Sequence, residues 1–341
     1  MTLFKKIFIA LLFLSVLFLD FSCGPSKKDQ ELEKAAQELK QIADHINNDF
    51  SLIRKENKIL ADQITQLYQK DNIEKQLNTV DRSKYRLHEN GVFYKHEDDG
   101  SSAVFVSGHI PVNQKIKEIV YFTEPLDLIF TQIIKAFPEI VQAYYNDKNS
   151  YNRIYPYFDV LTQYEPKMNI PAFNFYYLAD KQHNPQKKAV WVKEPYVDPA
   201  GRGWMVSAIA PVYINDSLEG VLGFDVTINA ITSRYLQQKH NNLMILDANG
   251  MIVSIQEYLA NLFSLPTLKD HKYLETIKLD TYLPEDFNLL YSKSKMVREM
   301  ATLIFKDNQG RVEFKRGAES FIVIVENIPE LDWKILKVIA E

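Results

Sequence analysis

One long stretch without proline or glycine constrains the fold of this chain most. Neither residue occurs between Lys27 and about Asn78, and apolar side chains recur there from Leu32 to Leu67 at steps of mostly three and four. This spacing predicts one amphipathic helix, which would extend roughly 75 Å. We expect it to serve as a stalk and spine that carries a domain away from a membrane. A homodimer formed through a coiled coil is the second interpretation.

The first 23 residues have the layout of a secretory signal. Lys5 and Lys6 precede an apolar run from Ile7 to Leu19, and Cys23 stands where cleavage would fall. The run is shorter than the roughly 20 residues that span a bilayer, which disfavours an uncleaved anchor. This layout resembles a bacterial lipoprotein signal, which implies lipidation of Cys23. A chain with one cysteine forms no intramolecular disulfide and no cysteine-based metal cluster.

Length and composition are those of a two-domain globular protein. The chain has 341 residues, of which 46% are hydrophobic and 25% charged, and its net charge is −4. One domain usually takes roughly 100–200 residues, so two fit. This charge balance gives no reason to expect nucleic acid as a partner. We expect a signal at 1–23, the long helix within 24–80, a membrane-distal subdomain at 81–240 and a membrane-proximal one at 241–341.

The first subdomain contains short alternating segments between turn residues, which predict an antiparallel sheet. Its expected strands cover residues 91–95, 102–107, 140–145, 151–158, 204–213 and 218–227. A helix is expected from Leu126 to Phe137. The chain from Val160 to Pro195 contains several prolines and is expected to be mostly loop, with a short helix around Phe173 to Asp180. Irregular chain over a sheet is where ligand sites tend to be built.

The second subdomain repeats this layout of strands and a helical middle. A strand, an Asn249-Gly250 turn and a second strand are expected between Leu243 and Ser254. The remaining expected strands are Ala301–Phe305, Arg311–Phe314, Phe321–Val325 and Trp333–Ile339. The chain therefore has the pattern of a duplicated α+β architecture with one antiparallel sheet in each unit.

Asp225 stands in an otherwise apolar strand, and Gly223 leaves room beside it on the same face. A buried ionised carboxylate is costly unless it is paired or hydrogen-bonded. A cationic ammonium ligand would pair it, and aromatic rings would add about 0.5–2 kcal/mol of cation–π attraction per contact. The alternative is a structural carboxylate that bonds to neighbouring backbone or to Tyr196.

Three segments carry a likeness to a known family: Pro195-Tyr196-Val-Asp198, Ser207-Ala-Ile-Ala-Pro211-Val-Tyr213 and Gly220-Val-Leu-Gly223-Phe-Asp225-Val. Together with the long N-terminal helix, they resemble the double Cache extracellular sensor domain. The resemblance implies an α+β fold in which a long N-terminal helix precedes two PAS-like antiparallel-sheet subdomains. It also implies that the distal subdomain binds a small molecule such as an amino acid, an amine or an organic acid.

The resemblance extends to individual residues. Family members that bind amino acids hold the ligand ammonium with a Tyr and an Asp that match Tyr196 and Asp225. They hold the carboxylate with an Arg followed two residues later by a Trp, and this chain has Phe173 and Phe175 there. The missing Arg favours an amine over an α-amino acid. Arg153, in the neighbouring hairpin, is a candidate to replace the Arg that holds the ligand carboxylate.

Candidate ligand-binding residues are acidic and aromatic side chains around this stretch: Tyr155, Tyr157, Asp159, Tyr176, Trp191, Tyr196, Asp198 and Asp225. For Asp198 the alternative is a turn in which its carboxylate bonds its own backbone. For Tyr176 and Trp191 the alternative is a place in the core.

No catalytic residue, metal site or cofactor is expected. The sequence has no Gly-x-Ser-x-Gly elbow, no His-Glu-x-x-His and no phosphate loop. We therefore expect a non-enzymatic, lipid-anchored sensor in the bacterial cell envelope that faces the periplasm or exterior and acts through a separate membrane signalling protein. The alternatives are a structural or assembly lipoprotein that works through the long helix and, less favoured, a periplasmic hydrolase.

Overall fold

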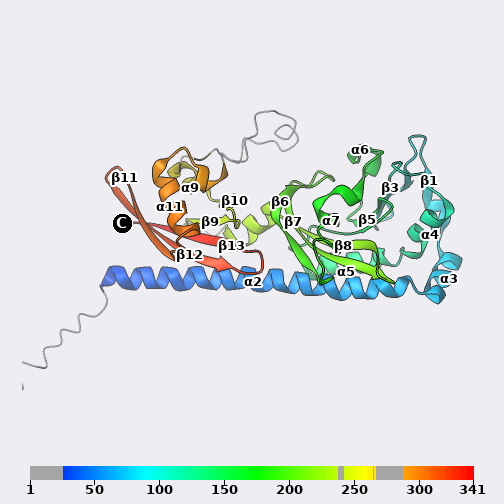
Figure 1. The fold of residues 1–341 in the computed structure, drawn as a ribbon, viewed down its shortest axis with the longest axis horizontal. Helices are drawn as coiled ribbons and strands as arrows, with labels where there is room; N and C mark the ends of the chain where they lie inside the picture. Colours follow the sequence, from blue (N-terminus) through cyan, green and yellow to red (C-terminus); the bar gives the residue numbers. More distant parts are fainter. Residues whose placement is uncertain (1–25, 237–241, 264, 266–286) are drawn as a thin grey trace, which may run out of the picture.

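The computed structural model describes residues 26–236, 242–263, 265 and 287–341. One long helix, α2 (Lys27–Leu67), runs beside two separate β-sheets (Figure 1). Its 41 residues correspond to about 62 Å. Within the described ranges, no helix is both long enough and apolar enough to cross a lipid bilayer. Cys23 and the signal expected around it lie outside these ranges.

The first sheet is antiparallel throughout and, in the described part of the chain, has eight strands in the order β1-β2-β3-β5-β4-β8-β7-β6. The strands are β1 (Tyr85–Leu87), β2 (Phe93–Lys95), β3 (Ala103–Val106), β4 (Gln142–Asp147), β5 (Tyr151–Tyr155), β6 (Val190–Val197), β7 (Trp204–Ile214) and β8 (Ser217–Thr227). Asn215 and Asp216 join β7 to β8 with φ of 47° and 63°, which is the left-handed backbone of a tight hairpin turn.

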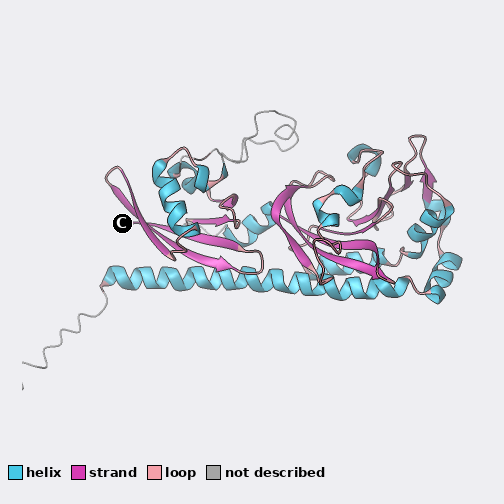
Figure 2. Ribbon diagram, viewed as in Figure 1, coloured by secondary structure: helices cyan, strands magenta, loops and turns pink. Residues whose placement is uncertain are grey.

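Helical segments cover both faces of the first sheet (Figure 2). The face packed against α2, α4 (Gln114–Phe122) and α5 (Leu126–Ala136) is called the helix face. The opposite face, called the cavity face, lies under α6 (Val160–Gln163), η2 (Ile170–Ala172) and α7 (Asn174–Tyr177). Four further helical segments flank the sheet in sequence: α3 (Lys70–Thr79), η1 (Arg82–Lys84), α8 (Ile228–Ile231) and the π-helical turn η3 (Thr232–Leu236).

The second sheet is also antiparallel, with five strands among the described residues in the order β10-β9-β13-β12-β11. These are β9 (Leu243–Leu246), β10 (Ile252–Ile255), β11 (Arg311–Arg316), β12 (Glu319–Ile328) and β13 (Trp333–Ala340). One face packs against α2. The other is covered by α9 (Glu257–Leu262), η6 (Leu289–Tyr291) and α11 (Lys295–Phe305).

The helix α2 joins the two sheets through one buried stripe. It begins at a capping box in which Ser26 and Asp29 satisfy each other's backbone N–H groups. Near its middle, the Phe50 ring lies 4.9 Å from the ring of Trp191 in β6 and 6.3 Å from the ring of Trp333 in β13. One helix side chain therefore contacts both sheets and helps fix their relative position.

The expected single helix to Asn78 is broken in the structure. α2 ends at Leu67, and α3 starts three residues later. The Tyr68 ring packs edge-on against Phe122 at 5.0 Å, and its hydroxyl hydrogen-bonds the Tyr145 hydroxyl at 2.6 Å. These tertiary contacts hold the chain at the break, and they involve residues that no local helix pattern contains.

Two further elements differ from the sequence prediction. The segment Ala301–Phe305 was expected to be a strand, but it forms the end of helix α11, whose buried side chains Val297, Met300, Ala301 and Ile304 follow helical spacing. The five residues Ala301–Phe305 alone fit the spacing of a strand and of a helix. The buried positions that precede them, Val297 and Met300, identify the segment as helical. Helix α4 was not predicted, although Asn113 caps it and Ile116, Ile119 and Val120 form its buried face.

Candidate ligand-binding site

The candidate site lies on the cavity face, where strand alternation sorts the side chains of β4 and β8. Gln142 is the register partner of Asp225, and Tyr144 is the partner of Gly223. Their neighbours Ala143 and Tyr145 belong to the core of the helix face. Consequently β4 presents a row of polar side chains to the cavity while its intervening residues pack toward α2.

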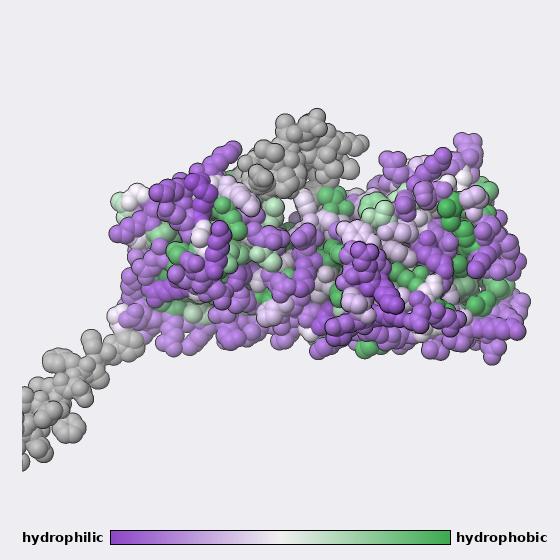
Figure 3. Space-filling view, viewed as in Figure 1, coloured by the Kyte–Doolittle hydropathy of each residue, from purple (hydrophilic) through white to green (hydrophobic). Residues whose placement is uncertain are grey.

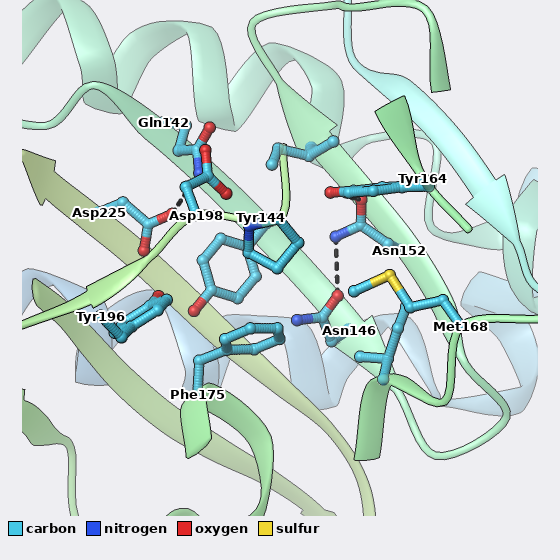
Figure 4. A pocket seen from close by; sticks show the side chains of 13 residues that line it. Gln142, Tyr144, Asn146, Asn152, Tyr164, Met168, Phe175, Tyr196, Asp198 and Asp225 are labelled. Carbon is cyan, nitrogen blue, oxygen red and sulfur yellow. Dashed lines mark hydrogen bonds between the residues drawn. The ribbon is translucent and has the colours of Figure 1, made fainter. Parts of the chain in front are cut away.

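A small cavity lies between these strands and the segment that carries α6, η2 and α7 (Figure 4). The strands contribute Gln142, Tyr144, Asn146, Asn152, Ile154, Tyr196 and Asp225, and the turn after β6 contributes Asp198. The covering segment contributes Tyr164, Met168, Ile170 and Phe175, and Pro199 completes the wall. The cavity volume is about 20 Å³, which is room for about one water molecule. The covering segment therefore packs close to the sheet and leaves little free space at the site.

Asp225 lies at the centre of a row of side chains across three strands. Its side chain is buried and accepts hydrogen bonds from Gln142 Nε2 on β4 and Ser207 Oγ on β7. Because Ser207 gives its one hydroxyl proton to Asp225, it accepts from the hydroxyl of Tyr196. Burial raises the pKa of Asp225 to about 8, and the nearby Asp198 carboxylate acts in the same direction.

Asp198 closes a turn at the end of β6. Its carboxylate accepts from the backbone N–H of Ala200 at 2.9 Å and of Arg202 at 3.1 Å, which is the arrangement that the turn interpretation describes. It also lines the cavity, and burial raises its pKa. Two carboxyl groups therefore line one cavity, and the Asp198 carboxylate disfavours ionisation of Asp225.

Two buried polar atoms beside these carboxylates have no hydrogen-bond partner of good geometry among the described residues, namely Gln142 Oε1 and the Tyr144 hydroxyl. None of the residues that line the cavity is Lys or Arg. Arg202, just outside the lining, acts on Asp225 only at a distance. Since carboxylates and an amide oxygen accept hydrogen bonds, this end of the cavity can hold a donor-rich cation.

Three of the eight residues expected from sequence come together at the cavity, namely Tyr196, Asp198 and Asp225. The structure places the remaining five elsewhere. Tyr155 packs into the core of the helix face. The ring of Trp191 lies against Phe50, and its indole nitrogen donates to Glu330 at 3.1 Å, so it joins the two sheets.

The other three expected residues belong to the covering segment or its approach. Tyr157 is half-buried with the ammonium of Lys95 5.8 Å from its ring centre. Asp159 is exposed and caps α6 by accepting from the N–H of Leu161 at 3.0 Å. Tyr176 is buried in the core of the cavity face without lining the cavity.

Arg153 cannot supply the missing cation, because it lies on the helix face. Its guanidinium is fully buried and donates to Asp127 at 2.6 Å, to the hydroxyls of Tyr85 and Tyr151, and to the carbonyl oxygen of Val120. At the position that the resemblance assigned to an Arg, the ring of Phe173 stacks on Phe175 at 5.1 Å.

Several cavity residues were missed by sequence reasoning: Gln142, Tyr144, Asn146, Asn152, Ile154, Tyr164, Met168, Ile170, Phe175 and Pro199. The alternation of Gln142, Tyr144 and Asn146 along one strand was a readable signal that these side chains share a face. It did not reveal which strand lies next to β4. No group of three or more His, Cys, Asp or Glu side chains that could hold a metal ion occurs in the described ranges.

Gly223 lets the Tyr144 ring lie flat across β8. A Cβ atom at position 223 would stand 1.9 Å from Tyr144 Cζ. We therefore expect Gly223→Ala to displace this ring and to lower the free energy of unfolding by about 1–3 kcal/mol. Denaturant unfolding measures the change. Gly310→Ala is the control, because a Cβ there meets no atom within 4 Å. Equal stability of the two variants would contradict the packing described.

No family model and no curated protein matches the sequence. Among solved structures, the extracellular domain of soHK1S-Z6, assigned as a histidine kinase, matches 92% of this chain and 94% of its own chain at a TM-score of 0.52 and 15% identity. The ligand-binding domain of the Campylobacter jejuni chemoreceptor Tlp3, in complex with L-norvaline, covers 93% and 95% at a TM-score of 0.49 and 10% identity.

The ligand-binding domain of the Pseudomonas aeruginosa PAO1 amino acid chemoreceptor PctC, in complex with GABA, covers 90% of this chain and 98% of its own at a TM-score of 0.48 and 13% identity. At 15% identity, the similarity to the soHK1S-Z6 domain is evidence of fold alone. A long helix followed by two antiparallel sheets confirms the α+β class that the sequence predicted. The chain has the double Cache fold of an extracellular sensor domain.

Proposed function

We propose that the chain is an extracytoplasmic sensor that binds a small amine-like ligand in the cavity of the first sheet and has no catalytic role. The proposal rests on one observation: Asp198 and Asp225 line the same cavity, and none of the described residues that line it is Lys or Arg. An ammonium group would supply the missing positive charge and could donate to both carboxylates and to Gln142 Oε1.

The energetics favour an ammonium over other ligand classes. A buried carboxylate with a pKa of about 8 is largely protonated at neutral pH, and a bound ammonium would favour its ionised form. An organic acid would bring a carboxylate beside the Asp198 carboxylate, and none of the lining residues is a Lys or Arg that could pair with it. An α-amino acid would bring a carboxylate that no lining cation meets. Amines are therefore the favoured class.

Entry of such a ligand requires the covering segment to move. The enclosed volume of about 20 Å³ is smaller than any organic amine needs. The covering segment consists of short helical pieces, α6, η2 and α7, joined by irregular chain. Segments of this kind open at low free-energy cost, whereas the strands beneath are held by a continuous hydrogen-bond ladder. We infer that the ligand displaces the cover and leaves the sheet in place.

The direction of α2 determines which of the two sheets would lie nearer the membrane. Its first residues lie beside the second sheet, and its last residues lie beside the first sheet (Figure 1). A lipid anchor at Cys23 would therefore place residues 241–341 near the membrane and residues 81–240, with the cavity, away from it. The signal would then pass along α2 to a separate membrane partner.

Anchoring at Cys23 can be tested directly. The Cys23→Ser variant is expected to lose lipid attachment, because only a thiol carries the lipid in the signal that residues 1–23 resemble. Membrane fractionation should then find the variant in the soluble fraction or as an unprocessed precursor of lower mobility. Unchanged membrane retention and unchanged electrophoretic mobility of the variant would contradict the lipid anchor.

A homodimer through α2, serving a structural or assembly role, is the second candidate. Leu52 and Ile59 lie two turns apart on this helix with 51% and 50% of their surfaces exposed. Hydrophilic side chains predominate along the edge of the molecule that α2 forms (Figure 3), so this apolar pair is small. It is the observation that favours the candidate.

If the pair is an interface, Leu52→Lys with Ile59→Lys should convert a dimer into a monomer in light scattering. Leu128→Lys, at a more exposed position on α5 (65%), should leave the dimer intact. A monomeric wild type would remove the candidate.

Titration calorimetry with short primary amines tests the proposed function itself. Heat of binding from the wild type and none from Asp225→Asn supports it, and absence of binding to the wild type contradicts it.

A further inference from the structure

The cavity has a polar group at each end. Asp225 and Gln142 form the acidic end, while Asn146 and Asn152 form the other, which is called the amide end. Gln142 and Asn146 are four residues apart on β4, which corresponds to about 13 Å along a strand. The ring of Tyr144 lies between the two ends (Figure 4).

The amide end presents a hydrogen-bond donor to the cavity. Asn152 Nδ2 donates to Asn146 Oδ1 at 2.7 Å, and the Tyr164 hydroxyl donates to Asn152 Oδ1 at 3.4 Å. The two asparagines are only 2% and 4% exposed. Figure 4 shows the Asn146 amide nitrogen turned away from Asn152, toward the side of the pocket where Phe175 lies. Among the described residues, the hydrogen bond of Asn146 with Asn152 uses its oxygen, so its nitrogen can donate to an acceptor on a ligand.

The charge of the cavity limits what this donor can meet. A carboxylate at the amide end would have no lining Lys or Arg, and it would share the cavity with Asp198 and Asp225. A neutral carbonyl or hydroxyl oxygen accepts the same hydrogen bond without that repulsion. The walls between the two ends are mostly apolar, with Ile154, Met168 and Phe175 among them, which suits methylene groups.

We propose that the ligand is an unbranched primary amine that carries a neutral hydrogen-bond acceptor at its far end. This rests on the proposed function, because Asp225 holds the ammonium while Asn146 Nδ2 donates to the acceptor. Of the roughly 13 Å between the two strand positions, two hydrogen bonds of about 3 Å take about 6 Å. The remainder is the length of about six bonds at about 1.2 Å each. An α-amino acid, with its two polar groups on adjacent carbons, cannot reach both ends.

Three amines of equal carbon count test the proposal by titration calorimetry on the full chain: 5-aminopentanamide, 5-aminopentanoate and pentylamine. The amide is expected to bind about tenfold more tightly than pentylamine, because one additional hydrogen bond to a buried donor forms. The carboxylate analogue is expected to bind more weakly than the amide.

The variant Asn146→Asp sharpens the test, because an aspartate can still accept from Asn152 while the free donor becomes an anion. This variant should prefer 1,5-diaminopentane over 5-aminopentanamide, the reverse of the wild type, and circular dichroism should report an unchanged fold. A variant that does not fold leaves the wild-type series to decide.

Equal affinity of the wild type for 5-aminopentanamide and pentylamine would overturn the two-ended ligand, as would a folded Asn146→Asp variant with the wild-type preference. If the wild type binds pentylamine and Asp225→Asn does not, the proposed function stands even when the two-ended ligand is wrong. Failure of all three amines to bind the wild type would overturn both.

Discussion

The Asp225→Asn variant is expected to bind primary amines at least about thirtyfold more weakly than the wild type. Removing one partner of a buried charge pair typically costs about 2–5 kcal/mol, and each 1.4 kcal/mol is tenfold in affinity. Asparagine has nearly the same shape and can still accept from Gln142, so the cavity should keep its form. Titration calorimetry with pentylamine at pH 7 measures the loss.

Asp159→Asn is the matched control, since the same chemical change is made at an exposed cap outside the cavity. This control should bind pentylamine as the wild type does. Equal weakening in both variants would show that the effect is not specific to the cavity.

The same substitution should change how stability depends on pH. Asp225 keeps its proton up to a pH of about 8 in the folded protein, whereas in the unfolded chain it releases the proton near pH 4. The folded state therefore binds more protons between these values, and wild-type stability falls as pH rises from about 4 to about 8. The full effect is on the order of 5 kcal/mol. Asp225→Asn should lack this pH dependence. Its free energy of unfolding should exceed that of the wild type at pH 8, and the difference between the two proteins should shrink toward pH 4.

Arg153→Leu is expected to lower the free energy of unfolding by about 3–5 kcal/mol, the second large effect. Removal of this guanidinium leaves the mostly buried carboxylate of Asp127 without its ion pair, and breaking a buried pair has a cost of this size. The hydroxyl of Tyr151 and the carbonyl of Val120 also lose a hydrogen bond. Denaturant unfolding gives the value.

Arg311→Leu is the control for this prediction, because its ion pair with Glu313 is exposed on the surface. Exposed pairs contribute at most about 1 kcal/mol. Folded Arg153→Leu should still bind pentylamine, since Arg153 lies on the face of the sheet opposite the cavity. Lost amine binding in a folded variant would contradict the assignment of Arg153 to the helix face.

The part of the site that could be predicted from sequence lies on one hairpin. Alternation of polar and apolar residues, with Asn215 and Asp216 at the turn, predicts β7 and β8 locally. The turn alone would place Ser207 opposite Phe224, and a β-bulge between Val212 and Tyr213 shifts the register so that Ser207 lies opposite Asp225. Tyr196 and Asp198 were predicted from the segment Pro195-Tyr196-Val-Asp198, which resembles the double Cache pattern. These residues are close in the sequence, so short-range rules reach them.

The other wall of the cavity depends on long-range pairing. Gln142 lies 83 residues from Asp225 in the sequence, and no turn residue specifies which strand sits beside β8. The roles of Tyr144 and Asn146 follow from that pairing and could not be predicted without it. The break after Leu67 has the same origin, because the contacts of Tyr68 with Phe122 and Tyr145 come from distant segments.

Strand alternation separates Trp191 from Tyr196, although both are aromatic and close in sequence. The two residues are an odd number of positions apart on β6, so simple alternation places them on opposite faces. In the structure Trp191 contacts Phe50 of α2, and Tyr196 lines the cavity. Residue type suggested a shared role that strand geometry excludes.

The most direct measurement of the central claim is a thermal-shift screen of primary amines, amino acids and organic acids on wild type and Asp225→Asn side by side. A ligand that binds only the folded state raises the unfolding midpoint. We expect amines to raise the midpoint of the wild type, organic acids to leave it unchanged, and Asp225→Asn to respond to neither class. A screen in which no amine shifts the wild type, or in which both proteins shift alike, would contradict it.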